Sequence, residues 1–185
     1  MREDLGLTDK QRQDLVKDLN VIINCAACLD LEARIEISLR ANVGGPLKLL
    51  KLAEECPKML CFLQVSSAFV NSDRTGFLEE RIYESTHNWS EDYRRVLTMP
   101  ARDLKANAKK ILGSFPNAYV YSKRMAEHML ILNNSKNIPL VLLRPSAIGT
   151  AANEPMPGWT DSLGLVLGAS LVVGLGVLRD MRGNG

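Results

Sequence analysis

The sequence predicts an α/β fold built on a doubly wound, parallel β-sheet. Three short apolar runs, at residues 20–24, 59–65 and 138–143, have the length and continuity of strands that are buried on both faces. Longer segments with apolar residues at helical spacing separate these runs. Strand, helix, strand, helix, strand is the order in which crossover helices connect parallel strands.

The N-terminal elements follow from capping and periodicity. Thr8 is a typical N-cap residue and predicts a helix that continues to about Leu19, with Leu15 on the same face. The first strand, 20–24, comes next. Residues 32–55 are predicted to form one long helix. Its apolar residues near helical spacing are Leu39, Val43, Leu47, Leu50 and Ala53.

The C-terminal elements are spaced more widely. Residues 72–115 are polar and irregular in pattern, and they predict one amphipathic helix near 101–112. A further helix is predicted from Tyr119 to about Leu132. Residues 163–178 are uncharged, contain four glycines and are shorter than the ~20 residues of a membrane-spanning helix. We predict a buried or substrate-facing helix there, with a re-entrant or interfacial segment as the alternative.

Composition excludes several classes of function. The 185 residues suit about one ordinary domain, and 46% hydrophobic and 24% charged residues are typical of a soluble globular protein. Basic residues are scattered and the net charge is +2, so we expect no nucleic-acid partner. His87 and His128 lack spaced partners, so we expect no metal site. The N-terminus does not have the pattern of a signal peptide.

The cysteines do not form a recognisable metal or redox set. Cys25 and Cys28 have the spacing of a redox motif, but no second such pair and no histidine pair completes a zinc site. We interpret all four as reduced, structural thiols of a reducing compartment. They are Cys25, Cys28, Cys56 and Cys61.

Polar residues follow each predicted strand. Asn24–Ala27 follow the first strand, Ser66 and Ser67 follow the second, and Arg144–Gly149 follow the third. In open α/β sheets, ligands bind at the carboxyl ends of the strands. The three strand ends are therefore predicted to meet in one crevice.

Tyr119 and Lys123 add an acid–base pair to this crevice. Their i,i+4 spacing places both side chains on one face of the predicted helix. An ammonium group close to a phenol favours the phenolate and lowers the tyrosine pKa, which makes Tyr119 a candidate proton donor near neutral pH. Ser67 is predicted to hold a substrate oxygen beside it. The alternative is a half-buried ring next to a solvated amine.

Five segments together carry a resemblance to a known family. They resemble the extended short-chain dehydrogenase/reductase superfamily and, within it, alcohol-forming fatty acyl-CoA reductases with their male-sterility/thioester-reductase-like NAD-binding domain. The last segment is the most specific, because sugar epimerases and dehydratases of the superfamily lack it. The segments are 20–27 (NVIINCAA), 65–71 (VSSAFVN), 116–127 (PNAYVYSKRMAE), 143–146 (LRPS) and 154–159 (EPMPGW).

The resemblance implies a reaction. NADPH would be the hydride donor and a long-chain acyl-CoA the substrate, reduced through a hemithioacetal and an aldehyde to a primary alcohol. Ser67 and Tyr119 would hydrogen-bond the thioester carbonyl. Lys123 would bind the nicotinamide ribose and lower the Tyr119 pKa, supported through water by Asn42. The residues implied to line the cofactor are Ala26, Ala27, Tyr119, Lys123, Arg144, Pro145 and Ser146.

Simpler roles stand beside these assignments. Ser66 is the alternative to Ser67, which we prefer because it directly precedes the small residue Ala68. Asn42 could instead satisfy backbone groups. Tyr121 lies about 200° around the helix from Tyr119, so we predict a structural role for it. Trp159 is predicted to be a packing anchor rather than a substrate contact.

The sequence also departs from the family pattern. A Rossmann-like domain opens with a strand and a Gly-x-x-Gly-x-x-Gly turn that binds the cofactor pyrophosphate, and these 185 residues contain no such turn. We therefore expect 1–185 to be a partial NAD(P)-binding domain, with a sheet that is incomplete at its N-terminal side. Residues 147–149 and 151–153 are also less bulky than the family's usual stretch.

Two other functions stay open at this point. One is a different extended reductase, acting on a carrier-protein thioester, a sterol or a sugar. The other is an inactive, truncated product that binds lipid or a partner. The resemblance also implies a cytosol-facing location at a peroxisomal or endoplasmic-reticulum membrane, with peripheral or tail-anchored attachment. Oligomeric state, acyl-chain length and whether reduction stops at the aldehyde do not follow from the residues.

Overall fold

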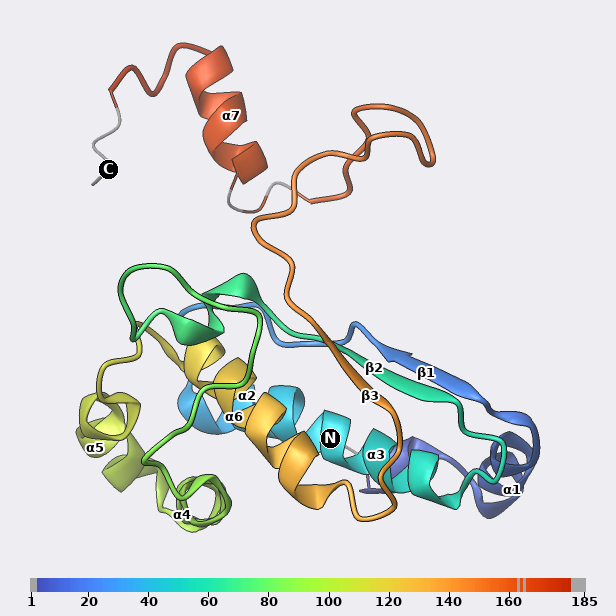
Figure 1. Cartoon of the computed structure of the whole chain (residues 1–185). Helices are drawn as coiled ribbons and strands as arrows, with labels where there is room; N and C mark the ends of the chain where they lie inside the picture. Colours follow the sequence, from blue (N-terminus) through green and yellow to red (C-terminus); the bar gives the residue numbers. More distant parts are fainter. Residues whose placement is uncertain (1–2, 163, 165, 181–185) are drawn as a thin grey trace. The chain divides into compact units, whose positions relative to one another are not determined.

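The computed structural model describes residues 3–162, 164 and 166–180, which form two compact units, Met1–Arg144 and Pro145–Gly185 (Figure 1). The first unit contains a parallel sheet with the strand order β1-β2-β3. Its strands are β1 (Val21–Asn24), β2 (Cys61–Val65) and β3 (Leu140–Leu143). This sheet and its flanking helices confirm the predicted α/β fold.

Two helical crossovers connect the strands. The first runs through α2 (Ile35–Leu39), a π-helical turn η2 (Arg40–Gly44) and α3 (Gly45–Glu55). The second runs through the 3₁₀ helix η3 and helices α4, α5 and α6. Their bounds are η3 Ala68–Asn71, α4 Trp89–Thr98, α5 Ala101–Leu112 and α6 Ala118–Asn133. Helix α1 (Asp9–Asp18) precedes the sheet, and the short 3₁₀ helix η1 (Glu3–Gly6) precedes α1.

The core of the sheet lies on the face that α3 and α6 cover (Figure 1). Phe62 of β2 is fully buried there, between Leu50 of α3 and Leu130 of α6. A second apolar cluster joins α6 to α2, α4 and α5, and it contains Leu39 and Val96. Helix α6 therefore belongs to both cores, which explains why most of its residues are buried.

The opposite face of the sheet is exposed, so the prediction of strands buried on both faces is wrong for the described residues. Ile23 is 64% exposed and Leu143 is 50% exposed, while their neighbours along each strand point into the core. The reason is topological. Crossovers between parallel strands are right-handed, and the strand order runs in one direction, so both crossovers lie on the same face.

The predicted long helix 32–55 begins at Ile35 and contains one wide turn. Pro46 has no backbone N–H, so it cannot bond the carbonyl of Asn42 four residues earlier. The π-helical turn at Arg40–Gly44 lies where that bond is lost, as such turns replace missing α-helical bonds. At Gly44, a Cβ atom would lie 2.8 Å from the Tyr93 hydroxyl, so a larger residue there would displace the Tyr93 side chain of α4.

The remaining helices agree with the predictions from the sequence to different degrees. Thr8 caps α1 in a capping box with Gln11, as expected for its N-terminus. Helix α5 lies at the predicted residues. Helix α4 was not predicted, although its apolar residues Trp89, Val96 and Leu97 lie at helical spacing. The Asn88 side chain, which accepts a hydrogen bond from the Glu91 amide, was a second sequence signal.

The second unit contains a closed loop and one helix. The amide of Ala151 donates to the Trp159 carbonyl, and the amide of Gly158 donates to the Ala151 carbonyl. Helix α7 (Val166–Gly174) lies within the predicted helical segment 163–178, of which residues 163 and 165 lie outside the described residues. The Leu171 and Val173 side chains are about half exposed. The buried or substrate-facing role of this helix stays a prediction. Among the described residues, every helix is too short or too polar to cross a membrane.

An aromatic cluster packs between α4 and α6. Tyr121 is fully buried and lies edge-on to Trp89, at 5.5 Å between ring centroids. This position agrees with its predicted structural role, and burial raises its pKa. The His128 ring also packs against Trp89, at 5.6 Å between ring centroids. Burial, aided by the Arg124 charge, lowers the pKa of His128 from 6.5 to about 4.

The core position of Phe62 gives a stability prediction. Phe62→Ala removes a fully buried ring and leaves a cavity between β2, α3 and α6, so the free energy of unfolding should fall by about 3–5 kcal/mol. Phe77, which is 93% exposed, provides the matched control. Phe77→Ala should change the value by less than about 0.5 kcal/mol in the same urea titration. Equal effects of the two substitutions would contradict the described core.

The His128 environment gives a pH prediction. Between pH 6.5 and about 4 the unfolded chain binds a proton on His128 that the folded chain does not, so stability falls as the pH drops through this window. His128→Gln removes this contribution, and its stability should decline less steeply than that of the wild type. Urea unfolding at pH 7.0, 5.5 and 4.5 measures both slopes. If the stability of the two proteins fell equally with pH, folding would not lower the pKa of His128, and the prediction would be wrong.

Candidate active site

The carboxyl ends of the three strands meet at one edge of the sheet, as predicted. The Ser66 amide donates a hydrogen bond to the Leu143 carbonyl at 2.6 Å, which ties the end of β2 to the end of β3. The buried Asn24 amide group donates to Gln64 Oε1 at 2.8 Å and ties β1 to β2. Asn24 Oδ1 then accepts from the Ala26 amide at 3.2 Å and turns the chain as it leaves the sheet.

Helix α6 brings Tyr119 and Lys123 to the end of β2. Asn117 caps the helix by accepting a hydrogen bond from the Val120 amide, which places Tyr119 in the first turn. Lys123 Nζ lies 6.0 Å from the centroid of the Tyr119 ring and donates to the Val65 carbonyl at 2.8 Å. The Lys123 side chain is therefore on the face that the i,i+4 spacing predicted.

Lys123 is buried, which excludes the solvated amine of the alternative interpretation. Only 3% of the residue is exposed. Burial lowers the pKa of the Lys123 amine, while the carboxylate of Glu127 opposes this effect. The ammonium group has three N–H donors, and only one of them is needed to bond the Val65 carbonyl. It therefore retains donors for another acceptor.

The two serines after β2 have different hydrogen-bond partners. Ser66 Oγ donates to the buried carboxylate of Glu127 at 2.6 Å, so its proton is committed. Ser67 Oγ instead accepts from the Phe69 amide at 3.2 Å, where it caps η3. Among the described residues, no acceptor takes the Ser67 hydroxyl proton. This difference supports the preference for Ser67 as the residue that donates to a substrate oxygen.

Asn42 joins the loop after β1 to helix α6. Its side chain accepts from the Cys28 amide at 2.7 Å and donates to the Cys28 carbonyl at 3.1 Å. It also donates to Ser122 Oγ at 2.9 Å, and Ser122 bonds the Tyr119 carbonyl. The backbone role considered for Asn42 is thus present. Its support of Lys123 through water stays a prediction.

The residues predicted to line the cofactor lie in different places. Ala26 is exposed and Ala27 is half-buried on the loop that follows β1. Arg144 follows β3, but its guanidinium is already bonded to Glu127 and to the Arg81 carbonyl. Pro145 and Ser146 are the first residues of the second unit. The cofactor contacts of all five residues stay predictions.

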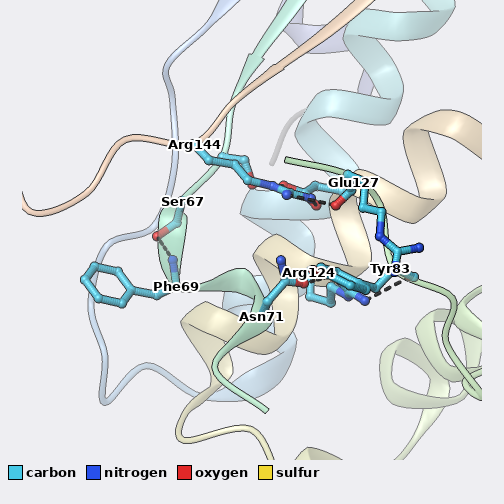
Figure 2. A network of polar contacts seen from close by, with 9 residues as sticks. Ser67, Phe69, Asn71, Tyr83, Arg124, Glu127 and Arg144 are labelled. Carbon is cyan, nitrogen blue, oxygen red and sulfur yellow. Dashed lines mark hydrogen bonds and ion pairs between the residues drawn. The ribbon is translucent and has the colours of Figure 1, made fainter. Parts of the chain in front are cut away.

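A buried polar network beside the site was missed by the sequence analysis (Figure 2). Glu127 and Arg124 of α6 are both almost completely inaccessible to solvent. Glu127 pairs with Arg144, and Arg124 donates to the Asn71 side chain and to the Tyr83 carbonyl at 3.0 Å. The signal was present in the sequence, since Glu127 follows Lys123 at i+4 and must share its helix face.

A groove of about 1050 Å³ is lined in part by Asn71 and Arg144 of this network. It runs beside β3 and is bounded by the loop around Leu78 and by the end of α6 at Ile131. Its lining includes Ala68, the residue after Ser67, and the apolar side chains of Leu140 and Leu142. Polar residues such as Glu79 and Asn134 also line it, so the groove is of mixed polarity.

Comparison with known families and structures gives consistent matches. A model of the NAD-binding family described as Male sterility protein matches residues 1–185. A solved thiolation-reductase di-domain from an archaeal non-ribosomal peptide synthetase is similar with a TM-score of 0.50 and 19% identity. That match covers 80% of this chain and 27% of the other, and at this identity it supports the fold alone.

Curated relatives match almost the whole chain. Fatty acyl-CoA reductase wat of Drosophila melanogaster is 26% identical over 97% of this chain and 34% of its own length. Fatty acyl-CoA reductase 8 of Arabidopsis thaliana is 30% identical over 95% of this chain and 40% of its own length. Fatty acyl-CoA reductase 2 of Mus musculus is 28% identical over 98% of this chain and 35% of its own length. The chain thus spans less than half the length of these relatives.

The position of Asn42 gives a prediction about how the site is held together. Asn42→Ala leaves the Cys28 amide without its acceptor and removes the link to Ser122, so the free energy of unfolding should fall by about 1–3 kcal/mol. Asn133→Ala is the control, because Asn133 is exposed and its side chain, among the described residues, bonds only the Met129 carbonyl of its own helix. Chemical denaturation of both variants measures the difference, and a loss no larger than that of the control would refute the role.

Proposed function

The chain belongs to the Male sterility protein family of NAD-binding domains, and on this premise we propose that the protein reduces long-chain fatty acyl-CoA to a primary fatty alcohol with NADPH. Family membership itself supports a nicotinamide cofactor. The acyl-CoA substrate is supported by the names of the relatives, which are fatty acyl-CoA reductases of animals and plants. The choice of NADPH over NADH and the alcohol as end product belong to the proposal.

One contact carries the proposal, the hydrogen bond from Lys123 Nζ to the Val65 carbonyl. It fixes the helix that carries Tyr119 against the strand end that leads into Ser67. Hydride transfer to a carbonyl needs a hydrogen-bond donor at the carbonyl oxygen and a proton for the resulting alkoxide. Ser67 and Tyr119 can supply both, because the Ser67 hydroxyl proton has no acceptor among the described residues.

The residues present fit the nicotinamide end of the cofactor. The buried Lys123 ammonium retains N–H donors after it bonds Val65, which suits the hydroxyl groups of a ribose. Ala26 and Ala27 leave the backbone after β1 uncovered by large side chains, as close approach of a nucleotide requires. The sequence has no glycine-rich turn for the pyrophosphate, so this part of the cofactor finds no matching residues in the 185.

The roles of the side chains follow from their surroundings. When bound, the cofactor supplies hydride for each of two reduction steps. Ser67 and Tyr119 orient the carbonyl oxygen and stabilise the negative charge that develops on it. In the second step Tyr119 transfers its proton to the alkoxide of the fatty alcohol. Lys123 stabilises the phenolate left on Tyr119, because its positive charge is buried and poorly screened.

The groove beside β3 gives the substrate a place to bind. Ala68, the residue after Ser67, lines it, so an acyl chain whose carbonyl lies at Ser67 can pass the apolar side chains of Leu140 and Leu142. Each methylene that is buried against them contributes about 0.8 kcal/mol. This apolar part of the groove supports a long-chain substrate, although Glu79 and Asn134 also line the groove.

Tyr119→Phe tests the proposed reaction in the protein expressed from its complete reading frame. Loss of the proton donor should reduce kcat for acyl-CoA-dependent NADPH oxidation by about 100-fold or more, because general acid catalysis contributes roughly 10²–10⁴-fold. The assay follows NADPH absorbance and separates aldehyde from alcohol by gas chromatography.

Tyr121→Phe provides the matched control on the same helix. Its buried hydroxyl has no hydrogen-bond partner in the part of the chain that the structure describes, so its removal should leave kcat within about twofold of the wild type. Wild-type turnover by Tyr119→Phe would contradict the assigned role. An active wild type that uses NADH and ignores NADPH would overturn the cofactor assignment alone.

A further inference from the structure

Glu127 is a buried carboxylate whose hydrogen bonds connect it to the ends of two strands, through Ser66 and Arg144. The residue is completely inaccessible to solvent. Its Oε1 accepts from Ser66 Oγ at 2.6 Å and from Arg144 Nε at 2.8 Å, and its Oε2 accepts from Arg144 Nη2 at 2.7 Å. A buried charge is costly unless it is paired and hydrogen-bonded, so this set of contacts must be retained in the folded protein.

Lys123 and Glu127 hold two consecutive residues of the strand end. They lie one turn apart on the same face of α6. Lys123 bonds the carbonyl of Val65, and Glu127 bonds the hydroxyl of Ser66. The next residue is Ser67. The distance between Ser67 and Tyr119 is therefore set by Lys123 and Glu127, which lie on the same helix as Tyr119.

The same carboxylate also fixes the loop that follows Ser67. Arg144, oriented by its two bonds to Glu127, donates from Nη1 to the Arg81 carbonyl at 3.0 Å. The neighbouring Tyr83 ring lies under the Arg81 guanidinium at 4.4 Å. The loop is thus attached to α6 through Glu127 and Arg144 (Figure 2).

We propose that Glu127 is a positioning residue of the reductase site, which aligns the Ser67 hydroxyl with Tyr119 by bonding Ser66. Glu127 contacts neither substrate nor cofactor and acts through its neighbour. For its kinetic consequence the inference rests on the proposed function, whereas its structural consequence can be measured without any reaction.

Amide exchange at Phe69 gives the structural test. The Phe69 amide donates to Ser67 Oγ, so its exchange rate reports where that hydroxyl lies. In Glu127→Gln and in Ser66→Ala the exchange at Phe69 should accelerate by about tenfold, as expected when a local hydrogen bond of ordinary strength is lost. Hydrogen–deuterium exchange resolved to this residue measures it.

A second glutamate–serine pair provides matched controls. Glu54 accepts from Ser135 Oγ at 2.8 Å, away from the strand end. Glu54→Gln and Ser135→Ala remove the same groups as the test variants and should leave the exchange at Phe69 unchanged. If Glu127→Gln does not fold, Ser66→Ala still tests the link, because it leaves the Glu127–Arg144 pair intact.

A double-mutant cycle gives the kinetic test. In the wild type, Ser67→Ala should lower kcat by about 100-fold, as loss of one donor to a developing oxyanion does. If Glu127 aligns Ser67, the same substitution should cost less than about tenfold in the Glu127→Gln or Ser66→Ala background, because the hydroxyl is already misplaced. In the Glu54→Gln background the full penalty should remain.

The outcomes separate the two proposals. Unchanged exchange at Phe69 in folded Glu127→Gln and Ser66→Ala would overturn the positioning role, and so would a full Ser67→Ala penalty in both backgrounds. A wild type that oxidises no NADPH with acyl-CoA would overturn the proposed function. In that case the exchange measurement alone decides whether Glu127 positions Ser67.

Discussion

The burial of charged groups on helix α6 is the constraint on which the rest of the first unit depends. Lys123, Arg124 and Glu127 all lie inside the protein, and each must find partners there because water cannot reach it. Helix α6 cannot supply those partners itself. They come from the end of β2, the end of β3 and the loop between η3 and α4. The charges therefore order segments that have few apolar contacts of their own.

This arrangement links stability to the geometry of the site. The apolar clusters that pack against α6 fix the position of the helix. Its polar side chains hold the ends of β2 and β3 against it. Tyr119 and Ser67 come from different elements, and neither bonds the other in the structure. Their relative position results from contacts made by Lys123 and Glu127, so residues beyond the reacting groups determine whether the site can operate.

The sequence predicted the elements that repeat a simple pattern and missed those that depend on tertiary contacts. The three strands were recognisable from continuous apolar runs, and helix α1 was recognisable from its Thr8 cap. The π-helical turn was not, because it reflects Pro46 within an otherwise regular apolar period. Helix α4 was missed although Trp89, Val96 and Leu97 lie at helical spacing, because this pattern stands within a polar segment, and its packing against α6 appears only in the structure. Of the site, Tyr119, Lys123 and Ser67 followed from spacing and strand ends, while Glu127 needed the structure to show its partners.

The π-helical turn at Arg40–Gly44 has a consequence for comparing relatives. Such a turn holds one residue more than an α-helical turn, so residues on its two sides are out of helical phase by about 100°. Asn42 lies inside it, and α3 follows with its apolar face already rotated. A single-residue gap at these positions in an alignment would therefore mark a relative in which the helix is regular. In that relative the residue aligned with Asn42 would point away from the helix that carries the tyrosine.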